Sequence, residues 1–251
     1  MTDIEIAVTR LLQARRAGTL MPAPALADAA AAYAVQTGVA RALGWFGDAA
    51  PAHWKSGGPS RAAVATHAPL PPAGIWATPA DARAWPFTLR GIEAEVALRL
   101  REPVDANRAA ALDVDSARAL VDAMCVSIEI VDLRWTEGLQ APPWAKLADL
   151  QSHGALVLGA WVPFDDARDW SAQSCRVRIG ASPAREFRGT HSMADPAFAL
   201  PAWLRHATRA GAVVSAGTVV TTGTWCGILH AKAGDEVEVV FDGIGQARVR
   251  L

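Results

Sequence analysis

The sequence predicts an α+β fold in which a helical N-terminal segment precedes a strand-rich remainder. Apolar residues recur at helical spacing over 3–17 and 25–43, whereas later segments mostly alternate or form short apolar runs. Regular helices do not separate these runs, so the βαβ units of a parallel sheet are not expected. With 51% hydrophobic and 20% charged residues, the chain can bury a sizeable core. We expect a single domain over 1–251, with a mainly helical segment, 1–85, and a β-rich core, 86–251.

Local signals define the N-terminal elements. The apolar stripe of 3–17 and the alanine-rich segment 25–43 are each followed by glycine, the residue that most often ends a helix. The turn-rich stretch 53–61, HWKSGGPSR, and the proline-rich stretch 68–86 predict loops.

The remainder contains further helices and several strands. Residues 116–125 are predicted to be helical, and so are residues 195–211, with Asp195 as N-cap and a break at Pro201. Asp242 and Gly243 predict a tight hairpin between the last two strands. Strands are predicted at 91–100, 126–135, 154–163, 174–180, 217–229 and 235–251.

Two glutamates share one face of the strand GIEAEVALRL, 91–100. Side chains alternate along a strand, so Glu93 and Glu95 point the same way, about 7 Å apart. One interpretation is a half-buried strand whose polar face meets water. The other is that the two carboxylates bind a hard cation between them.

A third carboxylate, Glu129, lies between Ile128 and Ile130 in another predicted strand. A buried glutamate is costly without a partner, so it faces solvent, pairs with an arginine or binds a metal. Three glutamates on two strands match the oxygen ligands that Mg²⁺ takes. The six histidines show no HxxxH or HxH spacing, which argues against a zinc enzyme.

Two further stretches have both a structural and a functional interpretation. Lys55, one of three lysines, is followed by two glycines and is either a surface residue or a proton carrier whose pKa a nearby dication lowers. The glycine- and threonine-rich stretch 217–229 is either a sheet corner or a pocket wall that holds a carboxylate with hydroxyl groups and backbone amides.

Composition excludes several classes of protein. A net charge of −1 gives no electrostatic basis for binding nucleic acid or an anionic membrane. No run of 18 apolar residues predicts a membrane span, and the acidic N-terminus does not resemble a signal peptide. Three widely spaced cysteines indicate a reducing compartment. We therefore expect a cytoplasmic protein.

Five motifs follow one another along the chain, namely HWKSGG (53–58), GIEAEVAL (91–98), SIEIVDLR (127–134), ADLQSHGALVLG (148–159) and the C-terminal block from residue 217. In this order they resemble the 2-keto-4-pentenoate hydratase branch of the fumarylacetoacetate hydrolase family, and the resemblance runs from about residue 30 to the C-terminus.

The resemblance implies a strand-rich roll or incomplete barrel with N-terminal helices packed alongside, and usually a homo-oligomer. It implies Mg²⁺ or Mn²⁺ at Glu93, Glu95 and Glu129. The matched catalytic residues are Lys55, Asp149 and Ser152, and the matched substrate-binding residues are Thr222, Gly223 and Thr224. His191, in the stretch RGTHS, is either a further substrate-binding residue or a histidine of a surface loop.

The sequence also departs from the family pattern. The aspartate that assists proton transfer in the hydratases is replaced by Pro72, although Gly74 is retained. Leu150 stands where the family has asparagine, and Ser56 stands where a β-branched residue is usual. These changes affect the acid–base partner and leave the three glutamates intact.

The activity implied by the resemblance is metal-dependent addition of water to a 2-hydroxy-2,4-dienoate, as in the breakdown of aromatic rings. Two alternatives use the same chemistry, namely decarboxylation of a 2-oxo-dioate and hydrolysis of an acylpyruvate. Another is a catalytically impaired structural partner, since hydratases and decarboxylases of this family can associate. Arg61, Arg134 and Arg188 are equal candidates for binding a second substrate carboxylate.

Overall fold

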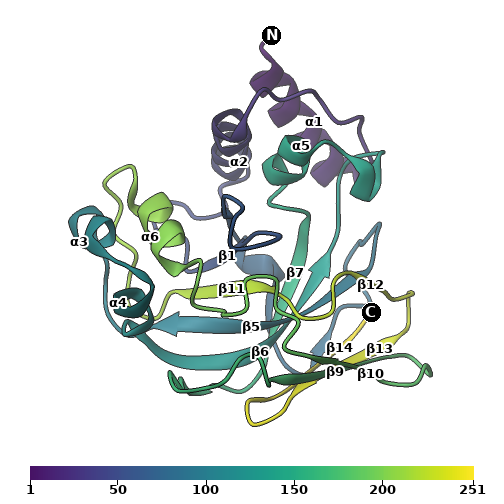
Figure 1. Ribbon diagram of the computed structural model, residues 1–251. Coiled ribbons are helices and arrows are strands. Elements are labelled where there is room, and N and C mark those ends of the chain that lie inside the picture. Colours follow the sequence, from purple (N-terminus) through teal and green to yellow (C-terminus); the bar gives the residue numbers. More distant parts are fainter.

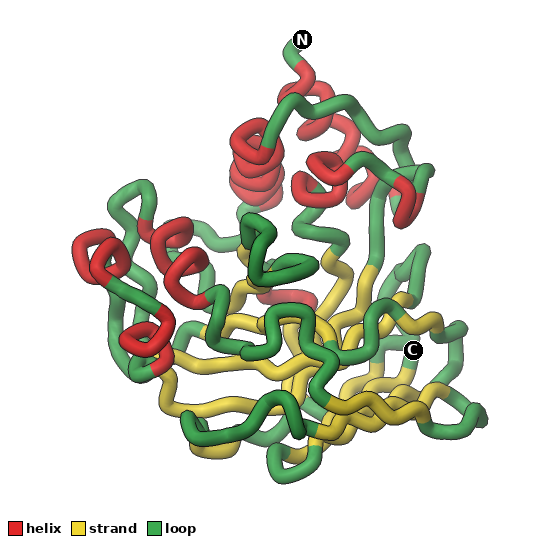
Figure 2. Tube along the Cα trace, viewed as in Figure 1, coloured by secondary structure: helices red, strands yellow, loops and turns green.

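The computed structural model describes residues 1–251 and consists of two packed β-sheets with two groups of helices (Figure 1). Figure 2 shows one helical group beside the N-terminus and the other at the far end of the larger sheet. The helices are α1 (Asp3–Ala17), α2 (Ala29–Leu43), α3 (Ala106–Ala111), α4 (Val114–Arg118), α5 (Pro143–Ala148) and α6 (Leu200–Thr208), with 3₁₀ turns η1 (Pro72–Gly74) and η2 (Gly138–Gln140).

The larger sheet has nine strands and the smaller sheet has five. The larger sheet runs in the order β2-β1-β11-β5-β6-β7-β3, with β12 paired to β5 and β8 paired to β6. Its strands are β1 (His53–Gly57), β2 (Thr66–Pro69), β3 (Ile75–Ala77), β5 (Gly91–Leu100), β6 (Val121–Val131), β7 (His153–Leu158), β8 (Val162–Pro163), β11 (Val219–Thr224) and β12 (Leu229–His230). The smaller sheet has the order β10 (Arg185–Arg188), β9 (Ser174–Ile179), β13 (Glu236–Phe241), β14 (Gly245–Arg250) and β4 (Ala80–Asp81).

The main hydrophobic core lies between the two sheets. From β5 it takes Ile92, Ala94, Val96 and Leu98, which are fully buried. The inner face of the smaller sheet contributes Val237, Val239, Phe241, Ala247 and Val249. Alternation along β5 therefore turns Glu93 and Glu95 away from this core, toward the side of the sheet on which α5 lies.

A second core joins the helices next to the N-terminus. Thr2 forms a capping box with Glu5 at the start of α1, and Asp28 caps α2. Leu11 of α1, Val35 of α2 and Leu147 of α5 pack in the same cluster. Helix α5, although distant in sequence, thereby becomes part of the N-terminal helical group.

Several predictions of secondary structure are confirmed. The helix over 3–17 has the predicted limits, and the second helix begins four residues later than predicted, at Ala29. The predicted strand 91–100 is β5, and β13 and β14 form a hairpin whose turn contains Asp242 and Gly243.

The prediction of a helix over 116–125 is wrong. Helix α4 ends at Arg118, and β6 already begins at Val121. Residues Val121–Cys125 pair with β5 and are mostly buried, so a long-range ladder overrides the local helical pattern. This pairing makes β6 one of the two longest strands in the protein.

Three other segments also differ from prediction. Residues 53–57, expected as a loop, form β1, and the loop 68–86 contains the short edge strands β3 and β4. Pro201 does not break a helix but lies in the first turn of α6, where the missing N–H costs nothing. Asp195 caps a preceding turn by accepting a hydrogen bond from the amide of Ala197.

The helical part of the N-terminal segment ends at Leu43, and residues 53–81 contribute four strands to the two sheets. No helix is long and apolar enough to cross a membrane.

Helix α6 packs on the edge of the larger sheet through the buried imidazole of His67 and the half-buried imidazole of His206. The rings of His67 and His206 lie 4.9 Å apart between centroids, and Tyr33 lies 4.2 Å from His206. Burial, with repulsion from His206 and Arg209, lowers the pKa of His67 to about 3. Burial, with the charge of Arg209, lowers the pKa of His206 to about 4. Both histidines are therefore neutral in the folded protein.

This cluster predicts a loss of stability in mild acid. The pKa values are lower in the folded state, so the stabilisation is complete above pH 6.5 and decreases as the pH falls from about 6.5 toward 4. Urea denaturation at pH 7.5 and pH 5.0 should show this loss, and His206→Gln should reduce it. The exposed His230→Gln is the control. Equal pH sensitivity of the two variants would contradict the assignment.

Candidate active site

Three glutamates converge on the face of the larger sheet that points away from the inter-sheet core. Glu93 of β5 is directly opposite Glu129 of β6 in the antiparallel register, and Glu95 is opposite Ser127. One carboxylate oxygen from each glutamate lies within 4.8 Å of the others. The strand pairing therefore gathers acidic groups that are 36 residues apart in sequence.

Lys55 enters this cluster from β1. Strand β1 runs parallel to β11, which places Lys55 beside Thr221. The Lys55 Nζ donates to Glu129 Oε1 at 2.5 Å and to the carbonyl oxygen of Gln151 at 3.1 Å. Burial favours the neutral amine, but the charges of Glu129, Glu93 and Glu95 outweigh it and raise the pKa of Lys55.

The glutamates are held at an electrostatic cost. Burial, followed by repulsion from Glu129, raises the pKa of Glu93 and of Glu95. Glu95 accepts a hydrogen bond from the Thr221 hydroxyl, and Glu129 Oε1 contacts His153 Nδ1 at 3.1 Å. The other oxygen of Glu129 is buried without a hydrogen-bond partner.

These observations fit a divalent cation. A bound cation would favour the ionised form of all three carboxylates, which together carry two more charges than the one ammonium group neutralises, and the unpartnered Glu129 oxygen is available as a ligand. All the donors are hard oxygen atoms, as Mg²⁺ and Mn²⁺ prefer. Glu93, Glu95 and Glu129 would hold such an ion.

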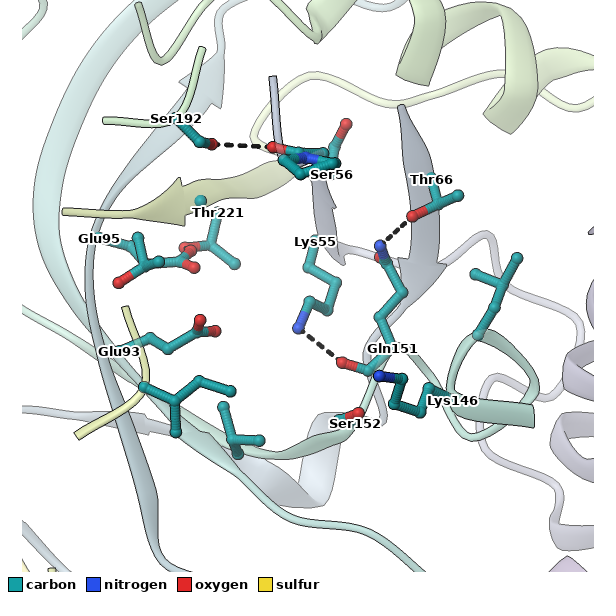
Figure 3. A pocket seen from close by; sticks show the side chains of 18 of the residues that line it. Lys55, Ser56, Thr66, Glu93, Glu95, Lys146, Gln151, Ser152, Ser192 and Thr221 are labelled. Atoms are coloured by element: carbon teal, nitrogen blue, oxygen red, sulfur yellow. Dashed lines mark hydrogen bonds between the residues drawn. The ribbon is translucent and has the colours of Figure 1, made fainter. Parts of the chain in front are cut away.

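The cluster opens into a cavity of about 510 Å³, a size typical of sites for small organic ligands. Figure 3 shows Glu93 and Glu95 on one wall, Lys55 in the middle, and Gln151 and Lys146 opposite. Apolar side chains of η2 and α5, Leu139, Trp144 and Leu147, line the cavity as well.

The structure brings most of the predicted site residues together. Lys55, Glu93, Glu95, Ser152, Gly223 and Thr224 line the cavity, and Glu129 contacts Lys55 at its base. Asp149, Thr222 and His191 do not line it.

Asp149 is fully buried in an ion cluster beside the cavity. Arg134 donates to both of its carboxylate oxygens at 2.8 Å, and Arg15 of α1 donates to Oδ1 at 2.9 Å. Burial, with repulsion from Arg134, lowers the pKa of Arg15 to about 10. Because both oxygens of the Asp149 carboxylate bind guanidinium groups, we infer that Asp149 stabilises the fold beside the cavity.

The next three residues, Leu150, Gln151 and Ser152, all have positive φ angles, between 54° and 65°. This left-handed conformation is costly for residues other than glycine and persists only where the surroundings enforce it. The turn directs the carbonyl oxygen of Gln151 toward Lys55 and places Ser152 in the cavity wall.

Thr222 and His191 are occupied with each other and with β5. The Thr222 hydroxyl donates to the carbonyl of Val96 at 2.7 Å, and His191 Nε2 donates to the carbonyl of Thr222 at 2.8 Å. A bulge in the pairing of β11 with β5 falls between Thr221 and Thr224. These two threonines, on either side of the bulge, line the cavity.

Sequence analysis missed Thr221, Gln151, His153 and Lys146. Strand alternation could have identified Thr221, because its neighbour Val220 belongs to the core. Gln151 contributes a backbone carbonyl, which has no sequence signature. His153 and Lys146 depend on the long-range placement of β7 and α5.

Residues 52–251 match the family model of the fumarylacetoacetate (FAA) hydrolase C-terminal domain. The chain belongs to the fumarylacetoacetate hydrolase family. The 2-hydroxyhexa-2,4-dienoate hydratase of Comamonas testosteroni is 29% identical over 163 residues, or 63% of this chain. The match spans only 59% of the length of that relative.

Two solved structures of 4-oxalocrotonate decarboxylase from Pseudomonas putida G7 have the same fold. The complex with calcium and acetate gives a TM-score of 0.81 at 17% identity, covering 100% of this chain and 98% of that one. The complex with magnesium and adipate also gives 0.81 at 17% identity, covering 98% and 96%. The expected strand-rich fumarylacetoacetate hydrolase fold, an incomplete barrel with helices alongside, is thus confirmed.

Replacing Asp149 should destabilise the folded protein strongly. Asp149→Asn leaves the guanidinium groups of Arg15 and Arg134 buried without their counter-charge, which costs about 3–5 kcal/mol. Asp122→Asn, which breaks the half-exposed pair with Arg99, should cost less than about 1 kcal/mol. Chemical denaturation measures both values, and similar losses would contradict the structural role of Asp149.

Metal binding should raise the melting temperature. An ion that binds only the folded state stabilises that state by about 2.7 kcal/mol when its free concentration is 100 times its Kd. Mg²⁺ or Mn²⁺ should therefore raise Tm, chelation should reverse the shift, and Glu95→Gln should abolish it. The exposed Glu186→Gln is the control. An undiminished shift in Glu95→Gln would exclude the three-glutamate site.

Proposed function

We propose that this protein is a metal-dependent hydro-lyase that adds water to a 2-hydroxy-2,4-dienoate and forms a 4-hydroxy-2-oxo acid. The observation that carries the proposal is the contact of the Lys55 ammonium with Glu129, inside a cluster of three glutamates at the end of a cavity. The hydratase of Comamonas testosteroni supports it as a relative. A role in the breakdown of aromatic compounds follows from this substrate class.

Glu93, Glu95 and Glu129 would hold Mg²⁺ or Mn²⁺ at one end of the cavity. The ion supplies Lewis acidity, which withdraws electrons from the carboxylate and C2 oxygen of a 2-oxo acid. The hydroxyl of Thr224 and the backbone of Gly223, both in the cavity wall, would orient the substrate carboxylate. Leu139 and Trp144 would exclude bulk water from the carbon chain.

Lys55 is the proton carrier of the proposed reaction. In a 2-hydroxypenta-2,4-dienoate, the C2 hydroxyl group loses its proton and C5 gains one, which gives the 2-oxo-3-enoate. The oxygen of water then bonds to C4, and the remaining proton goes to C3. The Gln151 carbonyl holds the Lys55 Nζ in place, and Ser152 would orient the attacking water. The product is 4-hydroxy-2-oxopentanoate.

Decarboxylation of a 2-oxo-dioate is the second candidate. Neither histidine nor aspartate lines the cavity, and Pro72 lies in η1, outside the cavity wall. Loss of carbon dioxide needs an electron sink and a proton donor, but it does not need a base to activate water. The same absence of a second base makes acylpyruvate hydrolysis the weaker alternative.

The decisive measurement is the ultraviolet absorbance of 2-hydroxypenta-2,4-dienoate in the presence of the protein. We expect the chromophore to decay only with Mg²⁺ or Mn²⁺, with 4-hydroxy-2-oxopentanoate as product. Lys55→Met should lower kcat by about 10²-fold or more, the usual range for a lost acid–base group. The exposed Lys232→Met is the matched control.

Other outcomes would redirect the assignment. Carbon dioxide release from 2-oxo-dioates without decay of the dienoate would identify a decarboxylase. Metal binding without turnover of any 2-oxo acid would contradict both activities and favour a structural partner of a related enzyme. Gel filtration would then test the expected homo-oligomer and its association with such an enzyme.

A further inference from the structure

The cavity has an acidic end and a basic end. Glu93 and Glu95 occupy one wall, and Lys146 of α5 lies across the cavity beside Gln151, with its ammonium group directed inward (Figure 3). Leu139 of η2, with Trp144 and Leu147 of α5, adds apolar surface to the same cavity. A ligand that extends from the glutamates toward α5 therefore meets a positive charge that has apolar side chains beside it.

The charge of Lys146 is not neutralised within the protein. Its half-buried side chain forms no ion pair, and Nζ makes one hydrogen bond, to the carbonyl oxygen of Leu139 at 3.1 Å. An ammonium group has three N–H donors, so two remain for a ligand. A partly desolvated, unpaired cation in a cavity wall binds an anion more strongly than a solvated surface lysine does.

No other cation is available at this end. Lys55 is engaged by Glu129 and Gln151. Of the three candidate arginines, Arg134 forms an ion pair with Asp149. Arg61 donates a hydrogen bond to the carbonyl of Met193, and its guanidinium group lies over the ring of Phe198. Arg188 is exposed on β10 in the smaller sheet, and none of the three lines the cavity.

We propose that Lys146 binds the distal carboxylate of the substrate, so that the preferred substrates are 2-hydroxy-2,4-dienedioates or the unsaturated 2-oxo-dioates that are their tautomers. The inference rests on the proposed function, which places the 2-oxo carboxylate at the three glutamates. The ammonium opposite that end then selects a second negative charge over an alkyl terminus. The apolar residues beside Lys146 would contact the uncharged carbons of the ligand.

The test compares two six-carbon probes that differ only at the far end. Isothermal titration of the Mg²⁺-loaded protein would measure the affinity of 2-oxoadipate, which ends in a carboxylate, and of 2-oxohexanoate, which ends in a methyl group. We expect 2-oxoadipate to bind at least about tenfold more tightly, as for a hydrogen bond to a charged group. Lys146→Met should remove this preference and leave the affinity for 2-oxohexanoate unchanged.

Two further variants separate charge from packing. Lys146→Arg keeps the charge and should keep most of the preference for 2-oxoadipate, whereas Lys232→Met should behave like the native chain. Equal native affinities for the two probes, or an equal loss of both in Lys146→Met, would overturn the role of Lys146 alone. Binding of neither probe in the presence of Mg²⁺ would overturn the proposed function together with it.

Discussion

Mutual repulsion of three carboxylates, two buried and one half-buried, is the constraint on which the site depends. Glu93, Glu95 and Glu129 each bring one oxygen within 4.8 Å of the others, and one ammonium group, from Lys55, is in direct contact with Glu129. Such an arrangement is unfavourable unless a further positive charge is bound, because burial penalises each unpaired charge. The rest of the fold therefore has to hold the glutamates together against their repulsion.

The antiparallel ladder of β5 and β6 does this. Ten residues of β5 pair with β6, and the inward-facing residues of both strands are locked in the core between the two sheets. A shift of register by one residue would turn the glutamates into that core, so the packing on one face fixes the site on the other. The apolar face of β5 and β6 stabilises the fold by packing in the core, and this packing holds the glutamates in place on the polar face.

Local patterns predicted the parts of the fold that depend on local interactions. Helices α1 and α2, strand β5 and the β13–β14 hairpin each have caps, an alternation or a turn that can be read in sequence. The start of β6 and all of β1 could not be predicted, because partners distant in sequence stabilise them. The site was also only partly predictable from local patterns. The three glutamates could be identified from their side chains, whereas the role of Gln151 depends on a backbone carbonyl that a strained turn directs toward Lys55.

The family model matches residues 52–251, but residues that precede this range also support the site. Arg15 on α1 contacts Asp149, which Arg134 holds as well, and Asp149 immediately precedes the left-handed turn 150–152. This turn carries the carbonyl that accepts a hydrogen bond from Lys55. The strain of three consecutive non-glycine residues is tolerated only because neighbouring contacts fix the turn at both ends. The N-terminal helices are therefore part of the framework that orients the proton carrier, and not a separate appendage to the β-rich core.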